Sequence, residues 1–200
     1  MEERREFFNK IALEWENEIP ECEKLERVVE LAKIEEGNII LDAGAGTGVL
    51  IPFLLKKVGR KGKIYAIDYA ENMIKKVKEK KFPQNVIPMV EDIHHTSFPP
   101  DFFDRIIANA CFPHFKNKVK ALKEIYRILK PNGILIISHP DGRKWVNSHH
   151  RKVHPAVKKD IVPSISVFKK LCESINFTLL KGIDEEYFFL LSFRKIIKKK

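Results

Sequence analysis

The chain has 200 residues, of which 44% are hydrophobic and 32% are charged, and its formal net charge is +10. Such a length fits one domain with a large core, no apolar run approaches the roughly 20 residues of a membrane span, and the charged start MEERREFF is unlike a signal peptide. The widely spaced Cys22, Cys111 and Cys172 argue against a disulfide framework or a zinc cluster and indicate a reducing, cytoplasmic setting.

The positive charge has two explanations. Many Lys and Glu residues beside only 2 Trp and 3 Met resemble the surface of a thermophile protein. A nucleic-acid partner is the alternative, but no RNA-binding motif accompanies the charge. We therefore prefer a charged, solvated surface.

The first 36 residues are expected to form a helical cap. Their apolar residues recur at helical spacing, with Phe8, Ile11 and Trp15 on one face and Leu25, Val28, Val29 and Ala32 on a second. Strands and helices then alternate: strands at 38–43, 63–68, 85–90, 104–110 and 133–138, and helices at 49–58, around 73–77 and at 117–129. Pro131 to Gly133 are expected to end the last of these helices. Alternation with apolar strands predicts a parallel sheet covered on both faces, a doubly wound α/β fold.

The end of the chain differs from this alternation. Segments 177–183 and 187–193 are joined by only three residues, which permits an antiparallel hairpin but no crossover. Pro88 lacks a backbone donor, so the third strand should lie at the edge of the sheet. Both features fit a sheet ordered 3-2-1-4-5 outward.

A glycine loop follows the first strand in ILDAGAGTGVL, residues 40–50. A dinucleotide fingerprint requires G-x-G-x-x-G, but Val49 occupies the place of the third glycine. Asp42 precedes the loop, and a carboxylate near a pyrophosphate costs on the order of a kcal/mol or more. Both residues disfavour NAD and predict a ligand that is positively charged at this end.

S-adenosylmethionine has the required charge, because it carries an ammonium and a sulfonium group. Its ribose needs an acceptor of hydrogen bonds, and Asp68 ends the second strand where such a carboxylate is expected. Tyr69 and Met73 follow and are expected to flank the adenine.

The motifs ILDAGAGTG, YAIDYAENMI, VEDI and LKPNGILIIS, in this order, and the opening FFNKIALEWE resemble the class I S-adenosylmethionine-dependent methyltransferases, in particular the type 11 group. The resemblance implies one domain over residues 1–200 with a Rossmann-like seven-stranded sheet in the order 3-2-1-4-5-7-6, the last strand antiparallel. It also implies S-adenosyl-L-methionine as cofactor. The residues that it implies for binding are Asp42, Gly44, Ala45 and Gly46 at the methionine end, Asp68 at the ribose, Asp92 and Ile93 at the adenine, and Asn109 closing the pocket.

All 7 histidines lie between residues 94 and 154, in segments that follow strands, at the edge of the sheet where ligands bind. They are either ordinary polar loop residues, or a base that removes a proton from the methyl acceptor, or metal ligands. For the base we expect His139 first and His114 second. A metal site at His149, His150 and His154 has no cysteine pair to support it, and we predict none.

Residues 139–163 are expected to form a long loop on the substrate side. Its basic residues beside Trp145 suit a carboxylate or phosphate on the acceptor, a charged flap that excludes water, or RNA.

The sequence therefore predicts a methyltransferase acting on a small molecule. Methylation of RNA or protein is the alternative, although no N-P-P-Y-type loop follows Asn109. A module that binds S-adenosylmethionine without catalysis is a further alternative.

Overall fold

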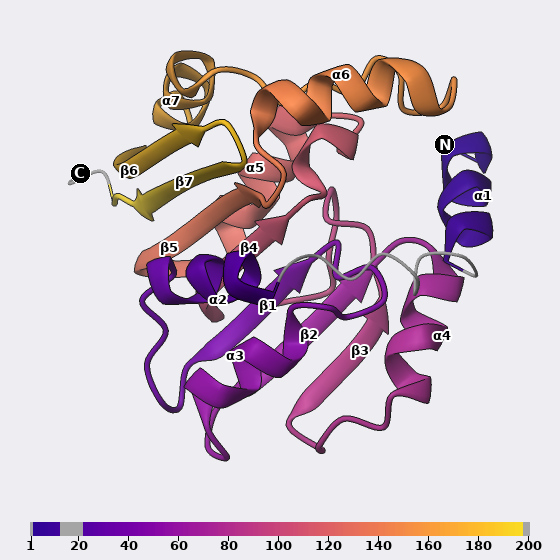
Figure 1. The fold of residues 1–200 in the computed structure, drawn as a ribbon. Helices are drawn as coiled ribbons and strands as arrows, with labels where there is room; N and C mark the ends of the chain where they lie inside the picture. The colour runs from indigo at the N-terminus through magenta and orange to yellow at the C-terminus, as the bar shows by residue number, and fades with distance from the viewer. Residues whose placement is uncertain (1, 13–21, 198–200) are drawn as a thin grey trace.

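The computed structural model describes residues 2–12 and 22–197. Its centre is a seven-stranded sheet in the order β3-β2-β1-β4-β5-β7-β6, flanked by helices (Figure 1). The strands are β1 (Ile39–Ala43), β2 (Lys63–Asp68), β3 (Val86–Val90), β4 (Phe103–Asn109), β5 (Leu129–His139), β6 (Phe177–Glu185) and β7 (Phe188–Lys195). The predicted fold class and strand order are thus confirmed, while Trp15 lies outside the described residues.

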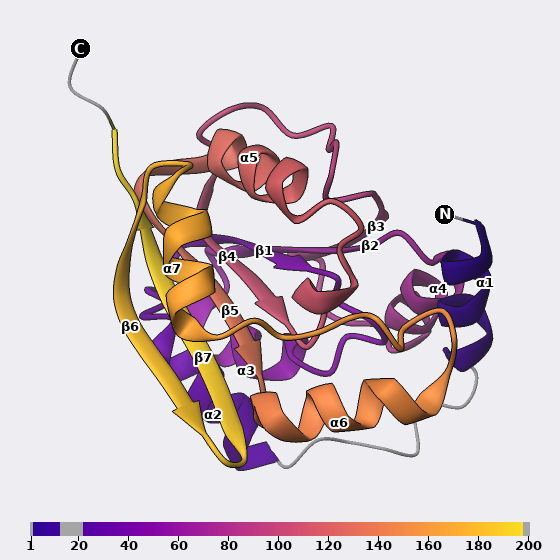
Figure 2. The same ribbon diagram turned by 90° about the horizontal axis from the view of Figure 1, so that it is seen from above.

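Helices lie on both faces of the sheet, as seen from above in Figure 2. They are α1 (Glu2–Ile11), α2 (Cys22–Leu31), α3 (Ile51–Val58), α4 (Glu71–Glu79), α5 (Lys118–Ile128), α6 (Arg143–Val153) and α7 (Ile165–Glu173), with a short 3-10 turn, η2 (Phe112–His114). Among the helices of residues 2–12 and 22–197, none is long and apolar enough to cross a bilayer.

Strand direction follows from the length of each connection. The pairs β3–β2, β2–β1, β1–β4 and β4–β5 are parallel, and β7 is antiparallel to both β5 and β6. Pro88 pairs with Ala66 on β3, which is the edge strand beyond β2, as predicted. Among the described residues, no strand lies on the outer side of β3, so no hydrogen bond to a further strand is lost because Pro88 lacks a backbone donor.

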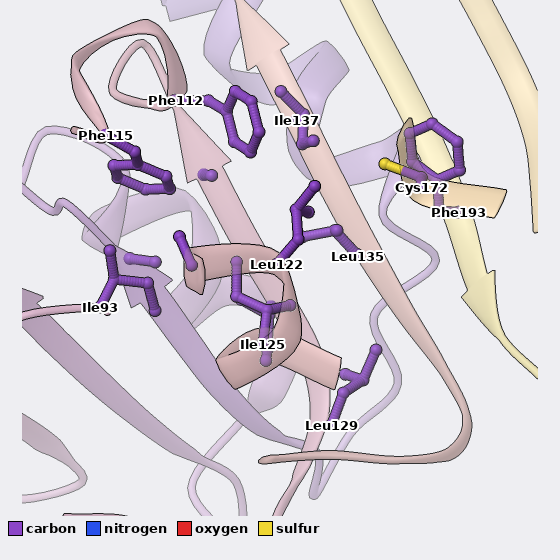
Figure 3. Close-up of a cluster of buried hydrophobic side chains, with 14 of the residues drawn as sticks. Ile93, Phe112, Phe115, Leu122, Ile125, Leu129, Leu135, Ile137, Cys172 and Phe193 are labelled. Atoms are coloured by element: carbon purple, nitrogen blue, oxygen red, sulfur yellow. The ribbon is translucent and has the colours of Figure 1, made fainter. Parts of the chain in front are cut away.

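Two hydrophobic clusters, one on each face, bury the apolar strands. Successive residues of β1 point to opposite faces, so Leu41 joins one cluster and Ile40 the other. Figure 3 shows part of the larger cluster, in which side chains of α5 and η2 meet those of β5 and β7. The phenyl rings of Phe112 and Phe168, 5.1 Å apart, help to join η2 to α7 in the same cluster. This packing on both faces holds the strands in place, and it thereby sets the positions of the side chains at their ends.

The start of β5 differs from the prediction. Pro131 to Gly133 do not end the helix, because the strand already begins at Leu129, which pairs with Phe103 before a register shift. The carbonyl of Leu129 also accepts a hydrogen bond of 2.6 Å from the buried ammonium of Lys195. The turn residues therefore form an irregular excursion inside the strand.

The predicted loop 139–163 contains the helix α6. Its inner face buries Val146 and His150, four residues apart, which is one helical turn. Asn147 ties it to the following segment, since its side chain both accepts from the Val162 amide and donates to the Val162 carbonyl. These tertiary contacts stabilise the helix. They could not be predicted from its polar sequence.

The glycine loop is held against the end of β2. The amides of Gly44 and Ala45 both donate to the Ile67 carbonyl, at 2.8 and 2.9 Å. Gly44 has φ +73°, and a Cβ there would lie 2.7 Å from Cβ of Cys111, whose thiol donates to the Ala43 carbonyl. Only glycine fits at this position.

We predict that Gly44→Ala lowers the free energy of unfolding by about 2–4 kcal/mol, because it combines a left-handed backbone with a steric clash. Gly46→Ala is the matched control: Gly46 has φ +54° but nothing within 4 Å of the added carbon, so it should cost about 1–2 kcal/mol. Urea denaturation of both variants measures the difference, and equal losses would contradict the packing argument.

Candidate functional site

A cavity of about 730 Å³ lies at the carboxyl ends of the parallel strands. This volume is within the usual range for sites that bind small molecules. Every residue predicted for the cofactor or for catalysis lines it: Asp42, Gly44, Ala45, Gly46, Asp68, Tyr69, Met73, Asp92, Ile93, Asn109, His114 and His139. Residues of α1 and α6 complete the wall. The topology therefore brings together residues of the strands β1, β2, β4 and β5, of several helices and of the turns that follow the strands.

Asp42, near the end of the central strand β1, carries an unsatisfied buried oxygen. The residue is 2% exposed, and its Oδ2 atom has no hydrogen-bond partner among the described residues. Burial, and then the charge of Asp68, raise the pKa of Asp42 to about 7. A positively charged group placed beside this oxygen would restore the ionised form.

Asp68 links the second strand to the glycine loop. Its Oδ2 accepts from the Gly46 amide at 3.1 Å and its Oδ1 from the Ala70 amide at 2.9 Å. Burial raises the pKa of Asp68 to about 6, against the effect of these hydrogen bonds. The carboxylate thus shapes the loop as well as facing the cavity.

Asp92 follows the third strand, and His94 holds its side chain in place. Sequence reasoning did not predict this contact. Oδ1 of Asp92 accepts from the amide of His94 at 2.9 Å and from Nδ1 of the same residue at 2.5 Å. This imidazole lowers the pKa of Asp92, and its Nε2 in turn accepts from the Asn117 amide at 3.2 Å. Asn109, after the fourth strand, accepts from the Ser138 hydroxyl at 2.8 Å.

The two predicted catalytic histidines have different surroundings. His139 ends β5 and is 7% exposed, and its Nδ1 atom has no hydrogen-bond partner. Burial first, and then the neighbouring histidines, lower the pKa of His139 to about 3. In contrast, Nδ1 of His114 lies 2.8 Å from Oδ2 of Asp160. Burial lowers the pKa of His114 too, but the hydrogen bond to Asp160 opposes the effect.

Asp160 lies behind the cavity wall and is a residue that sequence reasoning missed. Its Oδ2 accepts from His114, its Oδ1 accepts from Arg4 at 2.9 Å, and its backbone carbonyl accepts from Nδ1 of His150 at 2.6 Å. One signal was present in the sequence: it is the only acidic residue between Asp141 and Glu173. A lone buried acid in a basic segment indicates a specific partner.

Known proteins resemble this chain along most of its length. A family model described as a methyltransferase domain, of the type 11 group, matches residues 41–137. The ubiquinone/menaquinone biosynthesis C-methyltransferase UbiE of Hydrogenovibrio crunogenus is 29% identical over 158 residues, which are 74% of this chain and 62% of that protein. The demethylmenaquinone methyltransferase of Listeria welshimeri is 28% identical over 156 residues, 73% of this chain and 66% of that protein.

A solved structure extends the likeness to nearly the whole fold. The crystal structure of a SAM dependent methyltransferase from Aquifex aeolicus has a TM-score of 0.75 at 25% identity, covering 96% of this chain and 98% of that one. In sequence and in fold, the chain is therefore similar to the class I S-adenosylmethionine-dependent methyltransferases. It spans 62% and 66% of the lengths of the two curated relatives.

The cofactor of this family, S-adenosylmethionine, suits the cavity. In the part of the chain that the structure describes, three buried polar side-chain atoms on cavity residues have no hydrogen-bond partner: Asp42 Oδ2, Tyr69 OH and His139 Nδ1. Such atoms are costly unless a ligand or water satisfies them. The first of them meets the expectation of a positively charged ligand end beside the glycine loop.

The metal alternative drew on the same histidines. Within residues 2–12 and 22–197, no group of three or more His, Cys, Asp and Glu side chains is arranged to hold a metal ion. Instead, His149 stacks on Trp145 and His154 on Phe7, with ring centroids 4.6 and 4.5 Å apart.

We predict that Asp42→Asn stabilises the protein without ligand at alkaline pH and weakens binding of S-adenosylhomocysteine at least about 10-fold. An acid whose pKa is raised by folding stabilises the folded state below its unfolded pKa, and this contribution is lost as the pH rises through the folded value. With pKa values of 3.8 unfolded and about 7 folded, the gain at pH 8 should exceed the gain at pH 5 by about 1–3 kcal/mol.

Urea denaturation at the two pH values and calorimetry with S-adenosylhomocysteine measure these effects. Asp184→Asn is the control, since Asp184 pairs with Arg143 outside the cavity, and its effect should be similar at both pH values. If Asp42→Asn changed the free energy of unfolding equally at both pH values, the pKa of Asp42 would not be raised by folding.

Proposed function

We propose that this protein transfers the methyl group of S-adenosylmethionine to a small, planar, hydroxylated acceptor in the cytoplasm. The observation that carries the proposal is one cavity that joins the unpartnered carboxylate oxygen of Asp42 to a wall of aromatic and imidazole groups. The names of the relatives support a ring acceptor, because both proteins are named for methylation in quinone synthesis. The three described cysteines are free thiols, which suits a reducing compartment.

The cofactor half of the cavity is assigned from its polar atoms. When bound, S-adenosylmethionine supplies the electrophilic methyl group. Asp42 would hold its ammonium group, Asp68 its ribose hydroxyls, and Asp92 with the backbone of Ile93 its adenine. The remaining contacts would come from Gly44, Ala45 and Gly46 at the methionine end, Tyr69 and Met73 beside the adenine, and Asn109 behind the reacting groups.

The acceptor half has flat, largely apolar walls. Phe8 of α1, Trp145 and Val146 of α6, and the rings of His114 and His150 line it. Phe8 packs edge-on against His114, with ring centroids 5.2 Å apart. Walls of this kind exclude water and favour a planar ring over a flexible chain.

His114 is the preferred proton acceptor. A hydroxyl on the acceptor ring must lose its proton for the ring oxygen or the adjacent carbon to become a strong nucleophile. Because Nδ1 of His114 donates to Asp160, its Nε2 atom carries the lone pair that can take up this proton. Oδ2 of Asp141 lies 3.8 Å from Nδ1 of His139, too far for a hydrogen bond, and a pKa of about 3 makes His139 a weak base at neutral pH. We therefore propose His114 as the base, although the sequence had suggested His139 first. We place His139 beside the reacting groups.

A macromolecular acceptor is the alternative, and one feature favours it. Between Gly142 and Lys159 the chain carries no acidic residue and six basic ones: Arg143, Lys144, Arg151, Lys152, Lys158 and Lys159. This segment borders the cavity, so a polyanion such as RNA would be attracted to its mouth.

We predict that labelled methyl groups from S-adenosylmethionine enter hydroxylated aromatic compounds and leave RNA and protein unlabelled. A panel of phenols, naphthols and hydroquinones, tested beside transfer RNA and a cell extract split by size, measures this. Label confined to the macromolecular fraction would refute the small-molecule acceptor. Binding of S-adenosylhomocysteine with no transfer to any fraction would indicate the non-catalytic alternative.

We predict that His114→Gln lowers turnover by about 10²–10⁴-fold, the usual contribution of a general base, while affinity for S-adenosylhomocysteine stays within about 2-fold. His139→Gln should lower turnover less, because its ring is the weaker proton acceptor. Steady-state rates over pH 6–9 with an acceptor from the panel measure both variants. A larger loss in His139→Gln than in His114→Gln would restore the original order.

A further inference from the structure

Asp160 gathers three groups from distant parts of the chain. It is 5% exposed and lies 46 residues from His114 and 156 residues from Arg4. Its carboxylate accepts from both of them, and its carbonyl accepts from His150, whose ring lies 4.9 Å from that of His114. Since both imidazoles donate through Nδ1, both are left with the lone pair on Nε2.

Arg4 brings the helix α1 into this network. Its guanidinium donates to the carbonyl of His114 at 2.8 Å and to the carbonyl of Ala156 at 2.9 Å, besides its bond to Asp160. Figures 1 and 2 show α1 outside the layers of the main fold, beside α4 and near the end of α6. Phe8 of α1 nevertheless lines the acceptor half of the cavity.

A second anchor of α1 is independent of Asp160. Arg5 pairs with Glu71 of α4, and the side chain of Asn9 accepts from the Asn72 amide at 2.9 Å. Arg5 and Asn9 thus hold the helix to α4, whereas Arg4 holds it to Asp160 and His114. This arrangement separates simple attachment from an effect on His114.

We infer that Asp160 is a positioning residue for His114, and that Arg4, by binding the same carboxylate, couples the state of this base to the seating of α1 over the cavity. The inference rests on the proposed function. Asp160 holds the Nδ1–H tautomer that exposes Nε2, while Arg4 withdraws part of the negative charge of Asp160 from the imidazole. With α1 seated, the ring is oriented yet remains unprotonated, which is the state that a base requires.

Removal of Asp160 and removal of Arg4 should shift the pKa of His114 in opposite directions. Loss of the carboxylate removes the hydrogen bond that favours the protonated imidazole, so the pKa of His114 should fall. Loss of the guanidinium leaves the whole carboxylate charge to the imidazole, so the pKa of His114 should rise. The titratable or charged groups near His114 are Asp160, Arg4, His150, His139, Tyr69 and Lys118.

The test compares the full-length protein with Asp160→Asn, Arg4→Gln and the control Arg5→Gln, each carrying ¹⁵N-labelled histidine. Nuclear magnetic resonance measures the tautomer and pKa of His114, and hydrogen exchange measures the protection of α1. We expect a fall of about one pKa unit and a mixed tautomer in Asp160→Asn, and a rise of about half a unit in Arg4→Gln. Arg5→Gln should speed exchange in α1 and leave the pKa of His114 within about 0.2 unit.

An unchanged tautomer and pKa in Asp160→Asn would overturn the positioning role. Equal shifts in Arg4→Gln and Arg5→Gln would overturn the coupling, because any loosening of α1 would then suffice. Calorimetry with S-adenosylhomocysteine checks that each variant is folded, and if Asp160→Asn fails this check, the sign of the shift in Arg4→Gln decides the inference. A failure of the wild type to methylate any small acceptor would refute the proposed function and leave these readouts intact.

Discussion

The buried, unpartnered carboxylate of Asp42 is the constraint on which the rest of this structure depends. The strand β1 lies in the interior of the sheet, so the side chain is buried, and Oδ2 finds no donor among residues 2–12 and 22–197. Folding therefore holds a group whose charge is unfavourable until a positive ligand arrives. The glycine loop allows that ligand to approach, because Gly44 adopts a conformation and a spacing that no side chain permits.

A second buried acid, Asp160, binds residues of the cavity wall and is used in the opposite way. Asp160 is fully engaged, with hydrogen bonds from Arg4, His114 and His150. An acid left unpaired binds a cation, whereas an acid with several partners fixes their orientation. In the proposed function, the cofactor half of the cavity would thus select by charge, whereas the acceptor half is bordered by hydrogen bonds that reach across the chain.

Much of the proposed cofactor site was predictable because most of its residues lie at or just after the carboxyl end of a strand. Alternating apolar segments identify the strands, and the carboxyl ends of parallel strands meet at one edge. Asp42, Asp68 and Asp92 could therefore be grouped from sequence alone, and all of them line the cavity. The sequence did not predict the irregular start of β5 or the helix α6. Leu129 is in a strand because it pairs with Phe103, and Val146 is buried because it packs in the larger cluster, and both partners are distant in the sequence.

The sequence by itself determined the edge position of the third strand, the closing hairpin, the glycine loop and the carboxylate beside it, since these depend on short-range patterns and on rules of chain connection. Only the tertiary structure decided which histidine acquires an acidic partner and that α1 reaches the cavity. Neither the span from Arg4 to Asp160 nor that from Asp160 to His114 follows a local spacing rule. Contacts of this kind arise only when the packed core has already placed the segments side by side.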